Sequence, residues 1–267
     1  MSTLQQLMNR FEHAQFPKQP SSPVRATIFE AGAMLYVSFS STINAEVCLR
    51  GWESIKWHFY GKRASERYDL EDKKQIVVKI ATGEQLLFAR TSINSYGCGS
   101  NSIENVTQFI QYIHSLFKVS KVFLHIHPSN FHHLEAIQSV DVLRKSARVE
   151  IHEGTVTHEE MRRILTGFET DSLTIHCSTE RNFACDGTIS IGRIQILKGS
   201  WFKGPLLLNL DCQNFQYHKG KITEEHLNAF LREWLNNTPG CCRMQSLSVH
   251  LKRPQFSQLY DDSPPRK

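Results

Sequence analysis

The chain has 267 residues, of which 40% are hydrophobic, and its formal net charge is +5. This length and composition support a sizeable core and exclude a globally disordered chain. The positive charge is mild and spread out, without the basic run typical of a nucleic-acid or membrane tract, so neither kind of partner is predicted.

The first structured segment, from 16 to 57, opens with prolines and serines and then becomes mostly apolar. Four apolar residues recur near helical spacing: Val24, Ile28, Ala31 and Leu35. Such spacing predicts one or two short helices.

The segment from 58 to 100 contains two runs typical of strands, QIVVKI and QLLFAR. They are separated by ATGE, and Gly83 suits a tight turn. The pattern therefore predicts a β-hairpin.

From 101 to 251, periodic helices alternate with apolar strands. Helices are predicted over 101–117, 131–145 and 157–168, and strands over 121–127, 147–153 and 172–178. Thr157 and Glu160 have capping-box spacing at the start of one helix. Short connections between such elements predict parallel strands backed by helices. The strand starts at Lys121, Arg148 and Ser172 are about 20–29 residues apart, as in leucine-rich repeats. No repeat consensus is intact, and an ordinary α/β domain also fits.

After Cys177 three strands are predicted without intervening helices, over 188–199, 205–212 and 213–220. A helix follows over 221–237, with Thr223 as the N-cap. It has one apolar stripe: Leu227, Phe230, Leu231, Trp234 and Leu235. A last strand is predicted over 246–251.

The stretch HIHPSNFHH contains four histidines: His125, His127, His132 and His133. His125 and His127 alternate on a strand and share one face. A zinc site needs three or four converging ligands, and no HExxH motif, CxxC pair or nearby carboxylate set completes one. Two more histidines, His152 and His176, recur at the same position of later strands. These histidines are therefore interpreted as half-buried strand residues, with no metal and no other cofactor.

Other catalytic chemistry is not predicted either. Cys98 lies between glycines in GCGSNS, but a nucleophilic cysteine needs a base and a lowered pKa, and no base is visible. The motifs GxGxxG, GxxxxGK[ST] and GxSxG are absent from the sequence. The chain is therefore predicted to have no catalytic residues.

The cysteines and the N-terminus predict a compartment. Seven cysteines without framework spacing favour reduced thiols over a disulfide scaffold. The first twenty residues lack the apolar region of a secretory signal, and no stretch is apolar enough to span a bilayer. A cytoplasmic or nuclear protein, or one found in both compartments, is expected.

The stretch LLLNLDCQNFQYHKGKITEEHLNAFLREWLNN, followed by RMQSLSVHL, resembles the C-terminal signature of the second type of nematode F-box-associated domain. The positions that carry this resemblance are Asn209 to Cys212, Phe215, Thr223, Leu227, Asn228, Phe230, Leu231, Trp234, Leu247 and Val249. The resemblance implies an F-box-associated α/β domain, leucine-rich-repeat-like in its alternation of strands and helices, over residues 101–253.

Proteins of that family begin with an F-box, a short helical module that binds the Skp-family adaptor of cullin-RING ubiquitin ligases. Residues 14–57 resemble this module in degenerate form, because Ser22-Pro23 replaces the usual Leu-Pro and the basic Ser-Lys-Arg is missing. The adaptor-binding residues that the resemblance implies are Pro23, Val24, Ile28, Phe29 and Leu35. Residues 58–100 would be linking strands, and 254–267 a disordered tail.

The resemblance implies a substrate-recognition adaptor of an SCF-type ubiquitin ligase. Its partners would be a Skp-family adaptor with its cullin and an unknown target protein. The alternative is a protein-binding module that no longer engages the ligase and has no catalytic activity. Exposure of Val24, Ile28, Phe29 and Leu35 on one helical face would favour the first, and their burial the second. A third hypothesis, an enzyme, requires a pocket where the histidines or Cys98 meet further ligands or a base.

Overall fold

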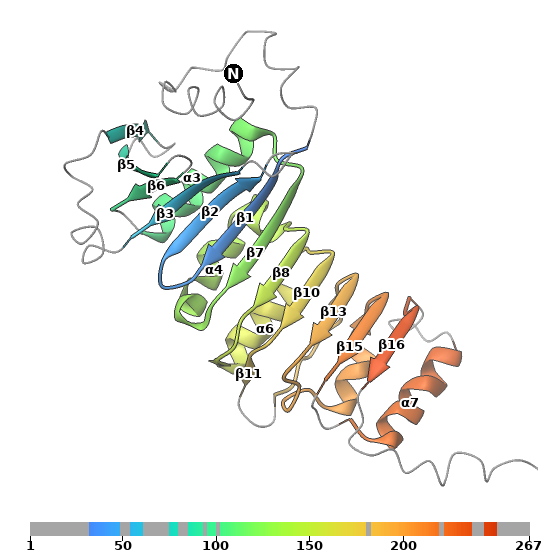
Figure 1. Cartoon of the computed structure of the whole chain (residues 1–267). Helices are drawn as coiled ribbons and strands as arrows, with labels where there is room; N and C mark the ends of the chain where they lie inside the picture. Colours follow the sequence, from blue (N-terminus) through green and yellow to red (C-terminus); the bar gives the residue numbers. More distant parts are fainter. Residues whose placement is uncertain are drawn as a thin grey trace, which may run out of the picture.

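The computed structural model describes residues 32–48, 54–60, 75–79, 85–92, 95–99, 102–179, 183–218, 222–236 and 243–249. Within these residues, twelve strands form one sheet in the order β16-β15-β13-β10-β8-β7-β1-β2-β3-β6-β5-β4 (Figure 1). Two separate two-stranded sheets pair β9 (Thr155–Val156) with β11 (Ser178–Thr179) and β12 with β14. The mixed α/β class predicted from the sequence is confirmed.

The sheet has a long parallel part. Its strands are β1 (Met34–Phe39), β7 (Lys121–Ile126), β8 (Arg148–Ile151), β10 (Ser172–Ile175), β13 (Arg193–Ile196), β15 (Asn214–Tyr217) and β16 (Ser246–Val249). Each of these strands pairs in parallel with the next. From β7 onward, spatial order follows chain order, with each strand added beside its predecessor.

The other part of the sheet is mostly antiparallel. It contains β2 (Ile43–Cys48), β3 (Ser54–Phe59), β4 (Gln75–Lys79), β5 (Gln85–Ser92) and β6 (Ser95–Cys98). Strands β4 and β5 form the predicted hairpin, although its turn lies outside the described residues. The sheet continues across the boundaries expected at 57 and 100, because β3 spans residue 57 and pairs with β6, and β1 pairs with β7.

The helical prediction for residues 14–57 is wrong over the part that the structure describes. MLYVSF and INAEVC alternate buried and partly exposed residues, which is the period of a strand. Leu35 points into the core from β1 and has 0% exposed surface. It therefore does not lie on an exposed helical face. Pro23, Val24, Ile28 and Phe29 lie outside the described residues, as does the predicted tail 254–267.

The described helices pack on one side of the sheet (Figure 1). They are α3 (Ile103–Phe117), α4 (Leu134–Gln138), α5 (Asp141–Arg144), α6 (His158–Thr166) and α7 (Glu224–Leu235), with the 3₁₀ segments η2 (Pro128–His133) and η3 (Gly204–Asn209). The capping box of Thr157 and Glu160 is confirmed, and Thr223 caps α7 together with His226. None of the described helices is long and apolar enough to cross a membrane.

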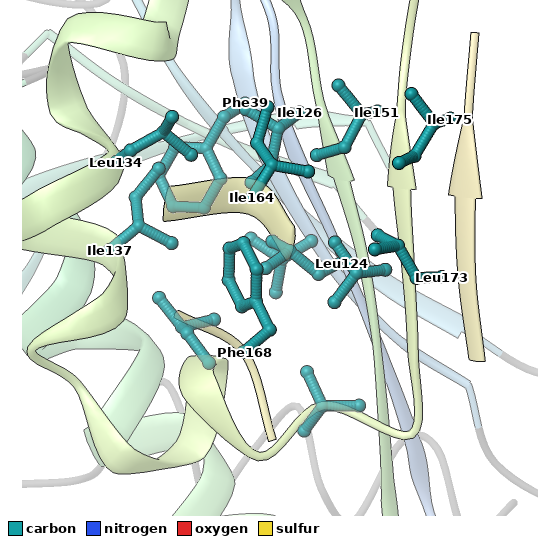
Figure 2. Packing of buried hydrophobic residues seen from close by; sticks show 14 of the residues in the cluster. Phe39, Leu124, Ile126, Leu134, Ile137, Ile151, Ile164, Phe168, Leu173 and Ile175 are labelled. Carbon is teal, nitrogen blue, oxygen red and sulfur yellow. The ribbon is translucent and has the colours of Figure 1, made fainter. Parts of the chain in front are cut away.

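A continuous apolar core lies between the helices and the sheet. Figure 2 shows Leu134, Ile137, Ile164 and Phe168 from the helical layer facing side chains of the strands. The strand side chains labelled there are Phe39, Leu124, Ile126, Ile151, Leu173 and Ile175. At the other end of the sheet, Trp57, Phe59 and Phe88 close around Phe109 of α3 with ring centroids 4.8–5.6 Å apart.

Two further strand predictions need correction. The run 205–212 is η3 followed by the short β14 (Leu210–Asp211) rather than one strand. The run 188–199 divides into β12 (Ile189–Ser190) and β13 around Gly192, whose Cα is so close to the Asp171 carbonyl that an added Cβ would lie 3.0 Å from it. The apolar stripe of α7 is only partly buried, since Phe230 is 1% exposed but Leu235 is 74% exposed.

Candidate functional site: the open face of the parallel strands

The sheet face opposite the helices is polar in its parallel part. In β7, Val122, Leu124 and Ile126 are buried against the helical layer, whereas Phe123 and His125 point to the other side and are only partly covered. The same alternation of burial recurs in β8, β13 and β15, because residues i and i+2 of a strand share a face. In β10 it does not, because Thr174 is buried as well, with 4% of its surface exposed. This surface is called the open face below.

Strand register aligns the residues of the open face into rows. One row crosses seven strands through mutually paired positions: Ser38, His125, Glu150, Thr174, Gln195, Gln216 and Ser248. Every member of the row can form hydrogen bonds. The row therefore places polar side chains side by side across the strands, with Thr174 buried in its middle.

A second row consists of histidines directly after the strand ends. His127, His152 and His176 each donate their backbone N–H to the preceding strand, at 2.8–2.9 Å. This repeated bond holds the three residues in register. The rings of His127 and His152 stack with centroids 4.0 Å apart and planes 7° apart. The rings of His152 and His176 are also near-parallel, with centroids 6.1 Å apart.

The two rows meet at a cluster of His125, Glu150, His152 and His176. His125 Nδ1 lies 3.3 Å from His152 Nε2. His176 Nε2 lies 3.4 Å from Glu150 Oε1. Burial lowers the pKa of His125 below its ordinary value near 6.5, although the Glu150 carboxylate opposes the shift. Burial and then the neighbouring His152 lower the pKa of His127 in the same way. Both shifts favour the neutral form of the ring, in which one nitrogen can accept a hydrogen bond or bind a ligand.

A hollow of about 580 Å³ lies at the opposite ends of the same strands. Four basic side chains contribute to its wall: Lys121, Arg148, Arg193 and Arg243. Asp171 is the acidic residue of the wall, while Glu150 and Asp211 pair with Arg148 and Arg243 at 3.4 and 2.8 Å. Phe123 forms an apolar side of the hollow and stacks on Tyr36. The hollow therefore combines basic groups with an aromatic wall.

The candidate residues predicted from the sequence lie in different environments: some in the core, some outside the described residues and some on the open face. Leu35 is in the core, and the other four adaptor-binding candidates lie outside the described residues. Cys98 ends β6 with 1% exposed surface, so its thiol does not face an accessible site. His125, His127, His152 and His176 lie together, although alternation predicted only that the first two share a face, and His132 and His133 lie apart in η2. Glu150, which sequence reasoning did not single out, becomes the neighbour of His125 through the parallel register of β7 and β8.

A family model described as F-box associated matches residues 173–249. The match includes most of β10 and all of β13, β15, α7 and β16, and it agrees with the resemblance in the C-terminal part of the sequence. The comparisons with curated proteins and with solved structures gave no match. The matched region thus contributes four of the parallel strands and their share of the open face.

Proposed function

We propose that the chain is the substrate-recognition subunit of an SCF-type ubiquitin ligase and that its open face binds the target protein. The observation that carries this proposal is the match of residues 173–249 to the F-box associated family. Domains of that kind accompany the module that engages the ligase. A recognition subunit positions its target and needs no catalytic group of its own.

The geometry of the parallel strands supports a recognition surface of the repeat type. The strands begin at residues 121, 148, 172, 193, 214 and 246, and each lies directly beside the one before it. We regard this part as leucine-rich-repeat-like, although its repeats lack a consensus sequence. Stacked repeats build long surfaces on which side chains of successive strands contact a protein partner. The two polar rows follow from this stacking.

The hollow indicates the chemistry of the bound segment. Arg148 and Arg243 already pair with Glu150 and Asp211, so the basic excess of the wall comes from Lys121 and Arg193 against Asp171. Arginine guanidinium groups bind carboxylates in a bidentate manner, and Phe123 adds apolar contact area. An acidic target segment with a hydrophobic residue therefore suits this site best. Ionic strength would weaken such binding, because exposed charges are screened within about 8 Å at physiological salt.

The attachment to the ligase depends on the N-terminal segment. With Leu35 in the core of the sheet, the adaptor would have to bind through Pro23, Val24, Ile28 and Phe29. The burial of Leu35 gives weight to the alternative function, a protein-binding module that does not engage the ligase. The two functions differ in a single interaction, which can be measured directly.

The test is a pull-down of the full chain with its Skp-family adaptor. Ile28→Asp and Phe29→Asp are compared with wild type and with Leu235→Asp, a matched control because Leu235 is already 74% exposed. Binding by wild type and the control, but not by the two N-terminal variants, would support the ligase function. If folded wild type does not bind the adaptor, the ligase function is wrong and target binding alone remains.

A further inference from the structure

We propose that His125, Glu150 and His152 form a binding site for a divalent transition-metal ion of the zinc class. The site lies on the open face, where the two polar rows cross. Its existence does not depend on the ligase function, because it follows from side-chain geometry alone.

The two histidine donor atoms already lie at the spacing of two ligands on one ion, and a Glu150 oxygen lies nearby. One ligand atom from each of the three residues lies within 4.8 Å of the others. Zinc–nitrogen bonds of about 2.0–2.1 Å in tetrahedral geometry separate two ligand nitrogens by roughly 3.4 Å. His125 Nδ1 and His152 Nε2 are 3.3 Å apart. The same distance also suits a hydrogen bond between the rings, which an arriving ion would replace.

The fold presents the three ligands from rigid elements. His125 is paired with Glu150 across β7 and β8, and His152 follows Glu150 on the same face two residues later. The backbone N–H of His152 bonds the Ile126 carbonyl at 2.9 Å, and its ring is stacked on His127. Ligands held in this manner lose little conformational freedom when an ion binds.

A neighbouring histidine can hold one of the three ligands in its orientation. His176 Nε2 lies 3.4 Å from Glu150 Oε1 and can orient the carboxylate that faces the ion. Partners of this kind fix the orientation of ligands in known metal sites.

The ligand set selects the class of ion. Two imidazole nitrogens and one carboxylate oxygen suit zinc and its transition-metal neighbours, whereas calcium and magnesium favour all-oxygen sites. Three protein ligands leave one tetrahedral position open, and the half-buried location gives solvent or a bound protein access to it.

The experiment is a calorimetric titration of the full chain with Zn²⁺ alone, which measures the dissociation constant for the ion. Cys48, Cys241 and Cys242 are replaced by serine in every sample, so that these thiols do not compete for the ion. His152→Gln is expected to weaken binding by at least about 100-fold, and Glu150→Gln by about 10–100-fold, since even supporting partners contribute that much. His218→Gln is the matched control. It follows the end of β15, three strands from β8, and should change the affinity less than twofold.

The proposal is overturned if His152→Gln binds Zn²⁺ as tightly as its parent, or if His218→Gln weakens binding equally. It is also overturned if Mg²⁺ at equal concentration displaces the Zn²⁺. A second measurement protects against misfolded variants. Nuclear magnetic resonance of the serine-substituted parent should show the ring signals of His125 and His152 changing with one equivalent of Zn²⁺ while that of His58 stays in place. Unchanged His125 and His152 signals would exclude the site.

Discussion

The ring of Tyr36 stacks on the ring of Phe123 with centroids 4.8 Å apart and planes 12° apart. The two residues are paired across β1 and β7, where the N-terminal strands meet the parallel part of the sheet. We expect Tyr36→Ala and Phe123→Ala each to lower the free energy of unfolding. The coupling in a double-mutant cycle should be about 0.5–1.5 kcal/mol, the value for stacked aromatic pairs. Urea denaturation measures it, and additive effects would show that the stack does not stabilise the junction.

The N-terminus of α6 gives a second prediction. Thr157 Oγ1 accepts the backbone N–H of Glu160 at 3.2 Å, and the Glu160 carboxylate accepts the N–H of Thr157 at 2.7 Å. Thr157→Ala removes one half of this box and should reduce the free energy of unfolding by about 0.5–2 kcal/mol. Thr166→Ala, in the last turn of the same helix, should change it by less than about 0.5 kcal/mol. Thermal denaturation compares the two variants, and an equal decrease of the melting temperature in both would contradict a role of the Thr157 cap.

A third prediction concerns the contact between successive strand-end loops. A Cβ added at Gly154, after β8, would lie 2.1 Å from Cγ of Pro128, after β7. Gly154→Ala should therefore force the loops apart at a cost of about 1–3 kcal/mol. At Gly187 no atom lies within 4 Å of the added Cβ, so Gly187→Ala should leave stability nearly unchanged. Chemical denaturation of the two alanine variants provides the comparison.

The histidines give a fourth prediction, on pH. Burial is the largest cause of a lowered pKa at each of the following residues: His58, His114, His125, His127 and His133. Below the ordinary value near 6.5, the unfolded chain therefore binds more protons than the folded chain. The free energy of unfolding should be fully retained above that value and should fall as the pH falls below it. Denaturation midpoints measured from about pH 7.5 to about pH 5 test this, covering the histidine range.

A matched variant separates one histidine from the rest. His58 Nδ1 lies 2.6 Å from Asn44 Oδ1 on the open side of β2 and β3. His58→Gln retains a hydrogen-bonding side chain but does not titrate, so it should make stability less dependent on pH. An unchanged pH dependence would show that His58 takes up its proton equally in both states.

Local signals in the sequence predicted much of the helical layer. The periodicity of 101–117 and the capping residues Thr157 and Thr223 located helices that the structure contains. Leu35 was misplaced because an apolar run can fit helical spacing over a few residues and still alternate as a strand. What decides between the two is the pairing of β1 with β7, a contact between distant segments that local spacing does not contain.

The candidate site was predictable only in part, for the same reason. Alternation places His125 and His127 on one face, and His152 and His176 recur at the same position of later strands, but their alignment in one row was not predicted. The position of Glu150 beside His125 depends on the register of two strands separated by η2, α4 and α5. A shift of one residue in that register would turn Glu150 into the core. Sequence reasoning therefore found the histidines but missed the carboxylate between them.

The position of β1 in the middle of the sheet has a consequence for how the chain is made. Met34 pairs with Lys121, and Ser120 reaches back 87 residues to bond the Ala33 carbonyl. At about 5–20 residues per second, the ribosome needs roughly 4 to 17 seconds to produce the partner of β1 after β1 itself. During that interval one edge of β1 is available to other nascent chains, and unpaired edges of this kind promote aggregation. The slow step in the folding of this protein during synthesis should therefore be the pairing of β1 with β7. A chaperone that shields strand edges should raise the yield of folded protein.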